Sequence, residues 1–473
     1  MSTTPELASA PVRTQLSTTR LTVGLCIGVM AMAFESLAVS TAMPRAAEEL
    51  GAKQWYAWAF SMFQGGMLFA TVTAGRIADR LGPVRPMLVG MAVFAVGLVI
   101  SGLAPTMVQL IIGRAVQGLG AGAMGVSLYV IIAKLYPDRK RPAVMSWIST
   151  AWVLPGFVGP PVSGWLTEHL SWHWVFGAVL PVVGVAAVLL TPTLLKAQRL
   201  GLGGPDDDPD GTGGTGGTGG AGSRPVPIWA AGMVAAAVPL LQYAAQQPGW
   251  WSLLMIGVAG LLLWRGLPRL MPAGLWRMRR GLGPVVALRF VVGGVYMATE
   301  AFLVLMLVDQ YHLDLRIAGL VLTIGTVGWT IGSFTQARWR IRRDLLMTIG
   351  VSGVTLGAAL SAVFAWQGTA PFWVFGTFFA ISALGMGMAY TSTSLAVMTL
   401  SGPNDQGRNA ASLSVAEALG ASLLTGLAGA GYAYGLRMLP DELPVVFGAV
   451  FVGVTLVAAL GVLASRRIGR IEH

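Results

Sequence analysis

Long apolar stretches alternate with short polar segments along almost the whole chain. A helix needs about 20 mostly apolar residues to cross the hydrocarbon core of a membrane. Stretches of about this kind lie at 21–43, 55–76, 87–105, 108–134, 142–166, 172–195, 228–246, 250–267, 284–308, 316–337, 345–366, 371–399, 409–435 and 443–465. The pattern predicts fourteen transmembrane helices, arranged as six, then two, then six.

The polar segments between these stretches divide the chain into predicted domains. Residues 197–225 combine clustered aspartates with a Gly/Thr repeat, a composition that favours a flexible linker over a packed core. An interfacial helix within residues 268–284 stays open as an alternative to a loop. The predicted domains are a cytoplasmic N-terminal tail (1–20), an N-terminal six-helix bundle (21–196), a flexible cytoplasmic linker (197–225), two extra transmembrane helices (226–268), a basic cytoplasmic segment (269–283), a C-terminal six-helix bundle (284–466) and a cytoplasmic tail (467–473).

Composition supports a membrane protein and excludes a soluble one. Of the 473 residues, 55% are hydrophobic and 11% are charged, whereas soluble domains carry about 25% charged residues. The single cysteine, Cys26, excludes an internal disulfide and a Cys-rich metal site, and the four histidines lack metal-ligand spacing. A phosphate-binding loop motif is absent from the sequence, which argues against ATP as the energy source. We therefore expect no metal and no cofactor.

The placement of basic residues predicts the orientation of the helices. Lys and Arg concentrate in the cytoplasmic loops of membrane proteins. With the N-terminus inside, the cytoplasmic segments hold 26 of the 31 basic residues, and Arg114 is the only one placed deep in a span. The outer segments hold four, which are Arg45, Lys53, Arg316 and Arg437. We expect an even number of spans with both termini in the cytoplasm, and we attribute the net charge of +11 to topology and not to nucleic-acid binding.

The loop after the second span, residues 75–86, reads GRIADRLGPVRP. It resembles the signature loop of the major facilitator superfamily. The resemblance implies a latch that holds one conformational state, formed by Gly75, Asp79, Arg80, Gly82 and Arg85. The alternative is a basic loop that only sets topology.

The fourth span contains Arg114, Gln117 and Gly118 in the order RAVQG. This resembles the RxxQG motif of the same superfamily, in which the arginine is tied to proton transfer. An arginine inside a membrane is costly and is usually paired. The alternative is that Arg114 extends to the outer surface, which is about two turns away.

The fifth span carries several prolines and small residues, which permit close packing against another helix. It resembles the antiporter motif of the superfamily, which marks exporters more than importers. The motif residues are Pro155, Gly156, Gly159, Pro160 and Gly164. The alternative is a kinked packing helix without a role in direction.

Two further stretches resemble the fourteen-span drug:proton antiporter branch of the superfamily. Residues 34–44, FESLAVSTAMP, resemble its first-span motif, with Glu35 in place of the usual Asp and Ser40 in place of the usual Asn. Residues 171–176, SWHWVF, resemble its entry to the sixth span. The resemblance implies two six-helix halves and efflux of drugs driven by a proton gradient.

Three carboxylates lie well inside apolar spans: Glu35, Glu300 and Glu417. An ionisable residue within the membrane indicates function by default. Together with Arg114 these acids are the predicted proton-coupling residues, and Glu35 or Glu300 also suits a cationic substrate. The alternative for each acid is a structural hydrogen bond to a neighbouring helix. We expect Asp309, at the end of its span, to be solvated.

Aromatic side chains within the spans suit a greasy cavity for planar or cationic compounds. The predicted cavity residues are Trp58, Phe63, Trp147, Trp152, Trp329 and Tyr390. The alternative for each of them is ordinary packing, or a place in the aromatic belt at the membrane surface.

These observations predict an all-α polytopic membrane protein with the major facilitator fold, two six-helix bundles plus two extra central helices. We expect a monomeric, proton-coupled exporter of drugs or small hydrophobic or cationic metabolites in the cytoplasmic (inner) membrane. Its partners are the small-molecule substrate, protons and the lipid bilayer, with no nucleic acid. The alternatives are an importer or lipid-like exporter on the same fold, a passive channel, and an integral-membrane transferase enzyme.

Overall fold

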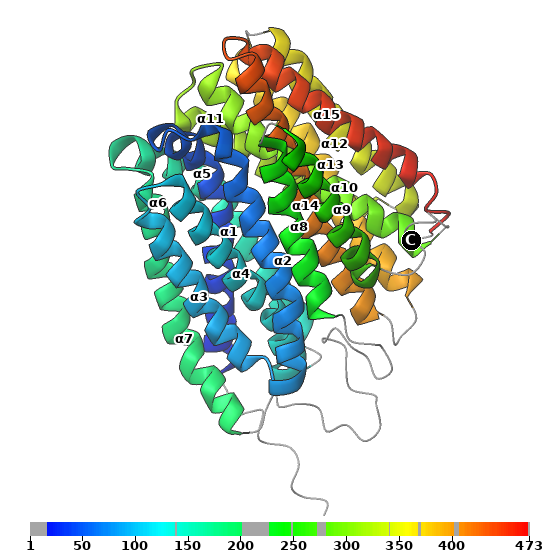
Figure 1. The fold of residues 1–473 in the computed structure, drawn as a ribbon. Helices are drawn as coiled ribbons and strands as arrows, with labels where there is room; N and C mark the ends of the chain where they lie inside the picture. Colours follow the sequence, from blue (N-terminus) through cyan, green and yellow to red (C-terminus); the bar gives the residue numbers. More distant parts are fainter. Residues whose placement is uncertain are drawn as a thin grey trace, which may run out of the picture.

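A computed structural model describes most of the chain. The described residues are 17–137, 140–200, 227–246, 249–271, 281–339, 341–367, 370–401 and 406–471. Most of the predicted N-terminal tail, most of the predicted linker and most of the predicted basic segment lie outside these ranges. In the described part every regular element is a helix, so the predicted all-helical architecture is confirmed (Figure 1).

The helices fall into two groups of six spans with a pair between them. The N-terminal half contains α1 (Thr18–Glu49), the short η2 (Lys53–Trp55), α2 (Tyr56–Leu81), α3 (Val84–Gly102), α4 (Met107–Leu135), α5 (Arg141–His169), α6 (His173–Gly177) and α7 (Val179–Arg199). The central pair is α8 (Ile228–Gln246) and α9 (Trp250–Leu270). The C-terminal half contains α10 (Leu282–Asp309), α11 (Leu315–Arg338), α12 (Arg343–Gln367), α13 (Phe372–Leu400), α14 (Gln406–Met438) and α15 (Leu443–Ser465).

Several helices extend beyond the apolar stretches that predict them. The first helix runs on through Pro44 to Glu49, and Pro44 is buried against neighbouring helices. Proline is tolerated inside a transmembrane helix because neighbouring helices satisfy the freed backbone groups. The sixth predicted span is divided at Ala178 into α6 and α7. Ser17 caps α1 by accepting from the Arg20 amide at 3.3 Å.

Two helices at the seams between the halves, α2 and α5, are less apolar than their seam partners α14 and α11, and α8 is apolar but short. In the described part, eleven helices are long and apolar enough to span a membrane, with α6 and α7 taken as one. The three remaining helices are α2, α5 and α8. Two of these, α2 and α5, carry the polar and small residues that face the opposite half. Their lower hydropathy therefore reflects contacts between helices, since lipid does not cover those faces.

The two halves pack against each other along two seams, α2 with α14 and α5 with α11. The central helix α8 contacts both α2 and α14, and α9 packs on α8, so the pair lies at the boundary between the halves (Figure 1). We use "outer end" for the ends of the helices that carry Lys53 and Asp309, following the predicted orientation. There Lys53 Nζ of the N-terminal half lies 2.9 Å from Asp309 Oδ1 of the C-terminal half. Arg316 of α11 also pairs with Glu168 of α5, and these contacts hold the outer end closed.

Candidate functional site

A buried ion pair joins α1 to α4 inside the N-terminal half. The guanidinium of Arg114 donates to Glu35, and both side chains are shielded from solvent. Arg114 also donates to the Ala59 carbonyl of α2 at 3.1 Å and lies 4.3 Å over the ring of Phe63. The guanidinium is thus held by three helices. It does not extend to the outer surface, so that alternative for Arg114 is wrong.

Gln117 hydrogen-bonds the arginine of this ion pair. Its Oε1 accepts from Arg114 at 2.6 Å, and its Nε2 donates to Gly97 O at 3.2 Å and Ser101 Oγ at 3.1 Å on α3. The glutamine and arginine of the RxxQG motif therefore form one network across four helices. Apart from Glu35 Oε2, which is buried without a hydrogen-bond partner among the described residues, these side chains bond one another across the helices. A buried network of this kind fixes its helices relative to one another.

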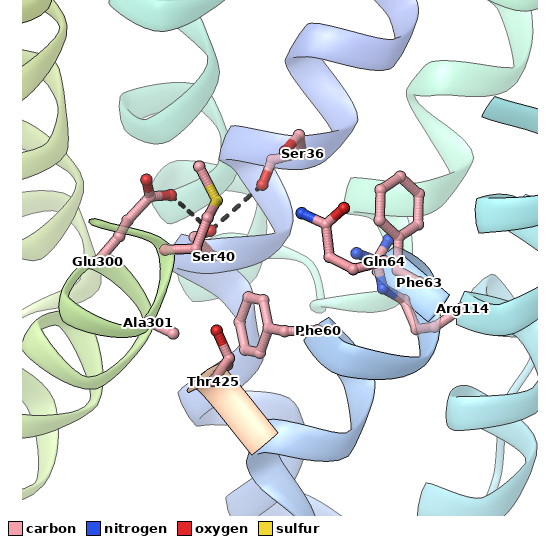
Figure 2. Close-up of a pocket in the computed structure, with 10 residues that line it drawn as sticks. Ser36, Ser40, Phe60, Phe63, Gln64, Arg114, Glu300, Ala301 and Thr425 are labelled. Atoms are coloured by element: carbon pink, nitrogen blue, oxygen red, sulfur yellow. Dashed lines mark hydrogen bonds between the residues drawn. The ribbon is translucent and has the colours of Figure 1, made fainter. Parts of the chain in front are cut away.

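Glu300 of α10 lies between the two halves, on a small cavity (Figure 2). Its Oε1 accepts from Ser40 Oγ of α1 at 3.0 Å, a hydrogen bond that crosses from one half to the other. Among the described residues no basic side chain forms an ion pair with it. Glu300 is the nineteenth residue of α10 and Glu35 the eighteenth of α1, so the two acids lie at matching depths with different partners.

The cavity contains polar groups from both halves. It is lined by Ser36, Ser40, Phe60, Phe63, Gln64, Arg114, Met297, Glu300, Ala301 and Thr425, nine of which are labelled in Figure 2. Its free volume is about 20 Å³, room for one or two water molecules. A drug-sized compound needs roughly 300–1,000 Å³. The structure is therefore closed around Glu300, and a substrate requires the halves to separate.

A second buried ion pair joins α10 to α14 inside the C-terminal half. Arg289 Nε donates to Glu417 Oε2 at 3.1 Å, and its NH1 donates to Tyr390 O at 2.6 Å and Thr393 Oγ1 at 2.9 Å. The guanidinium lies 3.2 Å over the Tyr390 ring. The Arg289 side chain is 4% exposed and Glu417 is 29% exposed, so one face of this pair is open.

Sequence reasoning missed Arg289 and misjudged Asp309. Arg289 falls inside the predicted span 284–308, so Arg114 is not the only arginine within a helix bundle. The sequence signal that identifies Arg289 is its position inside the predicted span. The count of basic residues in each loop does not reveal it. Asp309 was expected to be solvated, but its side chain is 6% exposed and bonds Lys53 and the Tyr432 hydroxyl, at 2.9 and 3.4 Å.

The predicted antiporter residues lie where α5 crosses two other helices. On one face, Gly156 accepts a hydrogen bond from Thr326 Oγ1 of α11 at 3.3 Å, and Gly164 faces the Arg316 backbone. Pro160 packs against Gly319 of α11 on the same face. Gly159, on another face of α5, lies against Phe34 and Leu37 of α1. Small residues at this spacing let α5 approach the opposite half and α1 at once.

The predicted latch residues lie at the inner end of α2. Gly82 follows the helix with φ +79°, a conformation that L-residues rarely adopt, so this turn requires glycine. Arg80 and Arg85 are exposed and Gly75 is buried. The Asp79 side chain lies outside the described residues, so its role as a latch stays a prediction.

The predicted aromatic residues do not form one cavity wall. Phe63 lines the cavity, and Trp329 and Tyr390 pack together at 5.6 Å beside Arg289. Trp58 stacks on Trp55 at 5.6 Å and is not among the cavity residues. Trp147 and Trp152 are exposed and lie outside the closed cavity. Trp152 lies on the face of α5 that carries Gly156.

Comparison with known families agrees with this geometry. The family model described as Major Facilitator Superfamily matches residues 25–425, which is most of the chain. The matched region includes α1, α4 and α10 in full or nearly in full, and with them Glu35, Arg114 and Glu300.

Related curated proteins are bacterial and fungal transporters. One is an MFS-type transporter of Mycobacterium tuberculosis, described as uncharacterised. It is 35% identical over 40% of this chain, but the match spans only 27% of that relative's length. A probable multidrug-efflux transporter of the same species is 24% identical, over 93% of this chain and 92% of its own. Multidrug resistance protein 3 of Bacillus subtilis is 25% identical, over 80% of this chain and 72% of its own.

Solved structures of low sequence identity share the fold. A mutant peptide transporter POT in complex with sulfate superposes with a TM-score of 0.65 at 15% identity, covering 95% of this chain and 94% of its own. A POT family transporter in complex with a thioalcohol-conjugated peptide gives a TM-score of 0.66 at 13% identity, covering 94% of this chain and 96% of its own. At these identities the likeness concerns the arrangement of helices alone.

Proposed function

The chain belongs to the major facilitator superfamily, and on that premise we propose that it exports lipophilic or cationic small molecules in exchange for protons. The family makes it a membrane transporter and not an enzyme, so the transferase alternative is set aside. Export is supported by the relatives named for multidrug efflux and by the antiporter motif at the crossing of α5 and α11.

The observation that carries the proposal is the placement of Glu300. It lies on the cavity between the halves, and its described partner is a serine hydroxyl from the opposite half. Glu35, at the matching depth, already pairs with Arg114. An intramembrane carboxylate without a fixed cation is free to bind either a proton or a cationic substrate.

Exchange follows from this competition at one carboxyl group. When the halves separate at the outer end, a proton reaches Glu300 and displaces a cationic substrate. When the outer end closes again, a protonated Glu300 accepts the Ser40 hydrogen bond less strongly than a carboxylate does. Since that bond joins the two halves, proton binding is coupled to their movement. After the halves close outside and open inside, the proton leaves and the next substrate enters.

We propose that the protein works as a monomer in the cytoplasmic membrane, with both termini inside. The support for both termini lying inside is the distribution of basic residues, together with the even number of long helices in the described part when α6 and α7 are taken as one. This orientation sets the Lys53 end outside and the Gly82 turn inside. The predicted latch loop then lies in the cytoplasm.

The test is transport into proteoliposomes with an imposed pH gradient, with and without Glu300→Gln. We expect the variant to lose at least tenfold in gradient-driven transport of a cationic dye, because glutamine cannot titrate. Exchange of a neutral lipophilic dye without a gradient should continue. The matched control is Glu442→Gln, an exposed acid directly before α15, which should transport as the wild type does.

Wild-type gradient-driven transport by Glu300→Gln would overturn the role of Glu300. The direction of transport relative to the gradient separates an exporter from an importer. Replacing the dye with a fluorescent lipid separates drug export from lipid-like export.

A further inference from the structure

The central helix α8 fills the seam between α2 and α14. A Cβ placed on Gly232 of α8 would lie 3.6 Å from the Phe69 ring of α2. Gly65 of α2 faces both Ala235 O of α8 and Ser422 Oγ of α14, at 3.9 and 3.7 Å from its Cβ position. Three helices therefore meet along this seam, one from each half and one from the central pair.

Gln242 is the polar side chain that α8 buries at this junction. Its Nε2 donates to Ser61 Oγ of α2 at 2.6 Å, and its Oε1 lies 2.8 Å from the same hydroxyl. Both side chains are buried. An amide in an apolar membrane helix is costly unless it finds a partner, and interhelical hydrogen bonds of this kind hold helices together.

The same junction contains a bond between the two halves. Ser422 Oγ of α14 donates to the Ser61 backbone carbonyl at 2.8 Å. This bond must break when the outer end opens, because its two helices belong to opposite halves. The Gln242–Ser61 bond lies between α8 and α2, so it need not break.

The contact of α8 with α14 is of a different kind. Gln242 packs on Gly426 so closely that a Cβ there would lie 2.9 Å from Gln242 Cγ. Gly426 has no side chain that could hydrogen-bond Gln242. It therefore permits α14 to slide past α8, whereas the hydrogen bond resists movement between α8 and α2.

We propose that Gln242 is a positioning residue for transport: it fixes α8 to α2, so that α8 keeps the α2–α14 seam closed to lipid while α14 moves. The inference rests on the proposed alternating movement of the halves. It assigns the extra central helices a role as a lateral seal. The α5–α11 seam relies on direct contact between small residues of its own two helices.

Disulfide cross-links test which half α8 follows. In a Cys26→Ser background, cysteines at Gly232 and Phe69, joined by a short reducible bis-methanethiosulfonate, tie α8 to α2, and cysteines at Gln242 and Gly426 tie α8 to α14. Because Gln242→Cys itself removes the Ser61 bond, each cross-linked protein is compared only with its own reduced form. We expect the first cross-link to leave dye transport within twofold of its reduced form. The second should reduce transport at least tenfold, with recovery on reduction. Block by the first pair, or free transport with the second pair oxidised, would overturn the proposal.

A labelling experiment tests the seal without any proton gradient. Thr425, buried on α14 beside the cavity, is replaced by cysteine in the same background and treated with lipid-dissolved pyrenyl maleimide. Gln242→Leu should increase the labelling rate at least threefold. The control is Tyr243→Leu, a half-exposed neighbour on α8, which should label like the parent. Equal rates in both variants would overturn the seal, whether or not transport proves to be proton-coupled.

Discussion

Glu35 and Glu300 occupy equivalent places in the first helices of the two halves, yet their surroundings differ in kind. Glu35 is bound to Arg114 of its own half, inside a network that includes Gln117. Glu300 is bound to Ser40 of the other half, beside a cavity. One acid belongs to a unit that can move as a whole, and the other belongs to the interface that must open.

This difference separates structural from switching chemistry. A charge pair within one half can keep its partners while the halves move, so we expect it to contribute to the integrity of that half. A hydrogen bond across the interface exists only while the halves are closed at that depth. Protonation of Glu300 can therefore change the strength of this hydrogen bond. The comparison predicts stability effects for the Arg114 network and equilibrium effects for the Ser40 bond.

The largest effect should come from Arg114→Met. It leaves Glu35 buried without its cation, and breaking a buried pair from one side costs about 3–5 kcal/mol. We expect a large fall in the unfolding midpoint and in the yield of purified protein. Tryptophan fluorescence during thermal unfolding in detergent measures the midpoint.

Two controls decide whether this loss belongs to the pair. Arg45→Met removes exposed pairs with Glu48 and Glu49 and should cost less than about 1 kcal/mol. Adding Glu35→Leu to Arg114→Met removes the orphaned charge and should recover most of the stability. A wild-type midpoint for Arg114→Met would show that the Arg114 network does not hold the N-terminal half together.

A smaller effect should follow from Arg289→Met in the C-terminal half. Its partner Glu417 is 29% exposed, so water can solvate the carboxylate once the arginine is gone. We expect a loss of about 1.5–3 kcal/mol, typical of hydrogen bonds to charged groups. The same unfolding measurement applies, with Glu417→Gln as the milder partner variant. A loss larger than that of Arg114→Met would break the comparison between the halves.

The helices were predictable because length and apolarity decide whether a segment spans a membrane. The partners of charged residues were not, because they depend on which helices meet. Arg289 lies near the start of its span, where the count of basic residues includes it with the cytoplasmic segments, yet it is buried against α13 and α14. Asp309 ends its helix, yet Lys53 and Tyr432 from elsewhere in the chain cover it.

The two first-span acids show the same limit at the site itself. Glu35 and Glu300 have the same sequence setting, one acid inside an apolar run, and the same predicted roles. Only the arrangement of α4 beside α1 supplies an arginine to Glu35, and only the contact of α1 with α10 supplies Ser40 to Glu300. The motif with Arg114 indicated a paired cation but did not identify its acid.

The smallest effect should come from Ser40→Ala. It removes one hydrogen bond between the halves, worth about 0.5–1.5 kcal/mol. The Glu300 carboxyl group is not left among apolar groups, because it still borders the cavity. We expect the outward-open population to rise by roughly two- to tenfold, with the unfolding midpoint nearly unchanged. Spin labels on cysteines at Leu170 and Leu439, exposed residues at the outer ends of α5 and α14, measure the opening as a longer distance.

The matched control is Ser163→Ala, because Ser163 makes the same kind of buried bond within one half. Its hydroxyl donates to the Ala38 carbonyl of α1 at 2.5 Å, and both helices belong to the N-terminal half. This variant should lower the unfolding midpoint slightly and leave the distance distribution unchanged. If both serine variants shift the distances equally, the Ser40–Glu300 bond is not special to the interface. If neither shifts them, the bond does not contribute to closure, and the coupling between Glu300 and the movement of the halves must run through another contact.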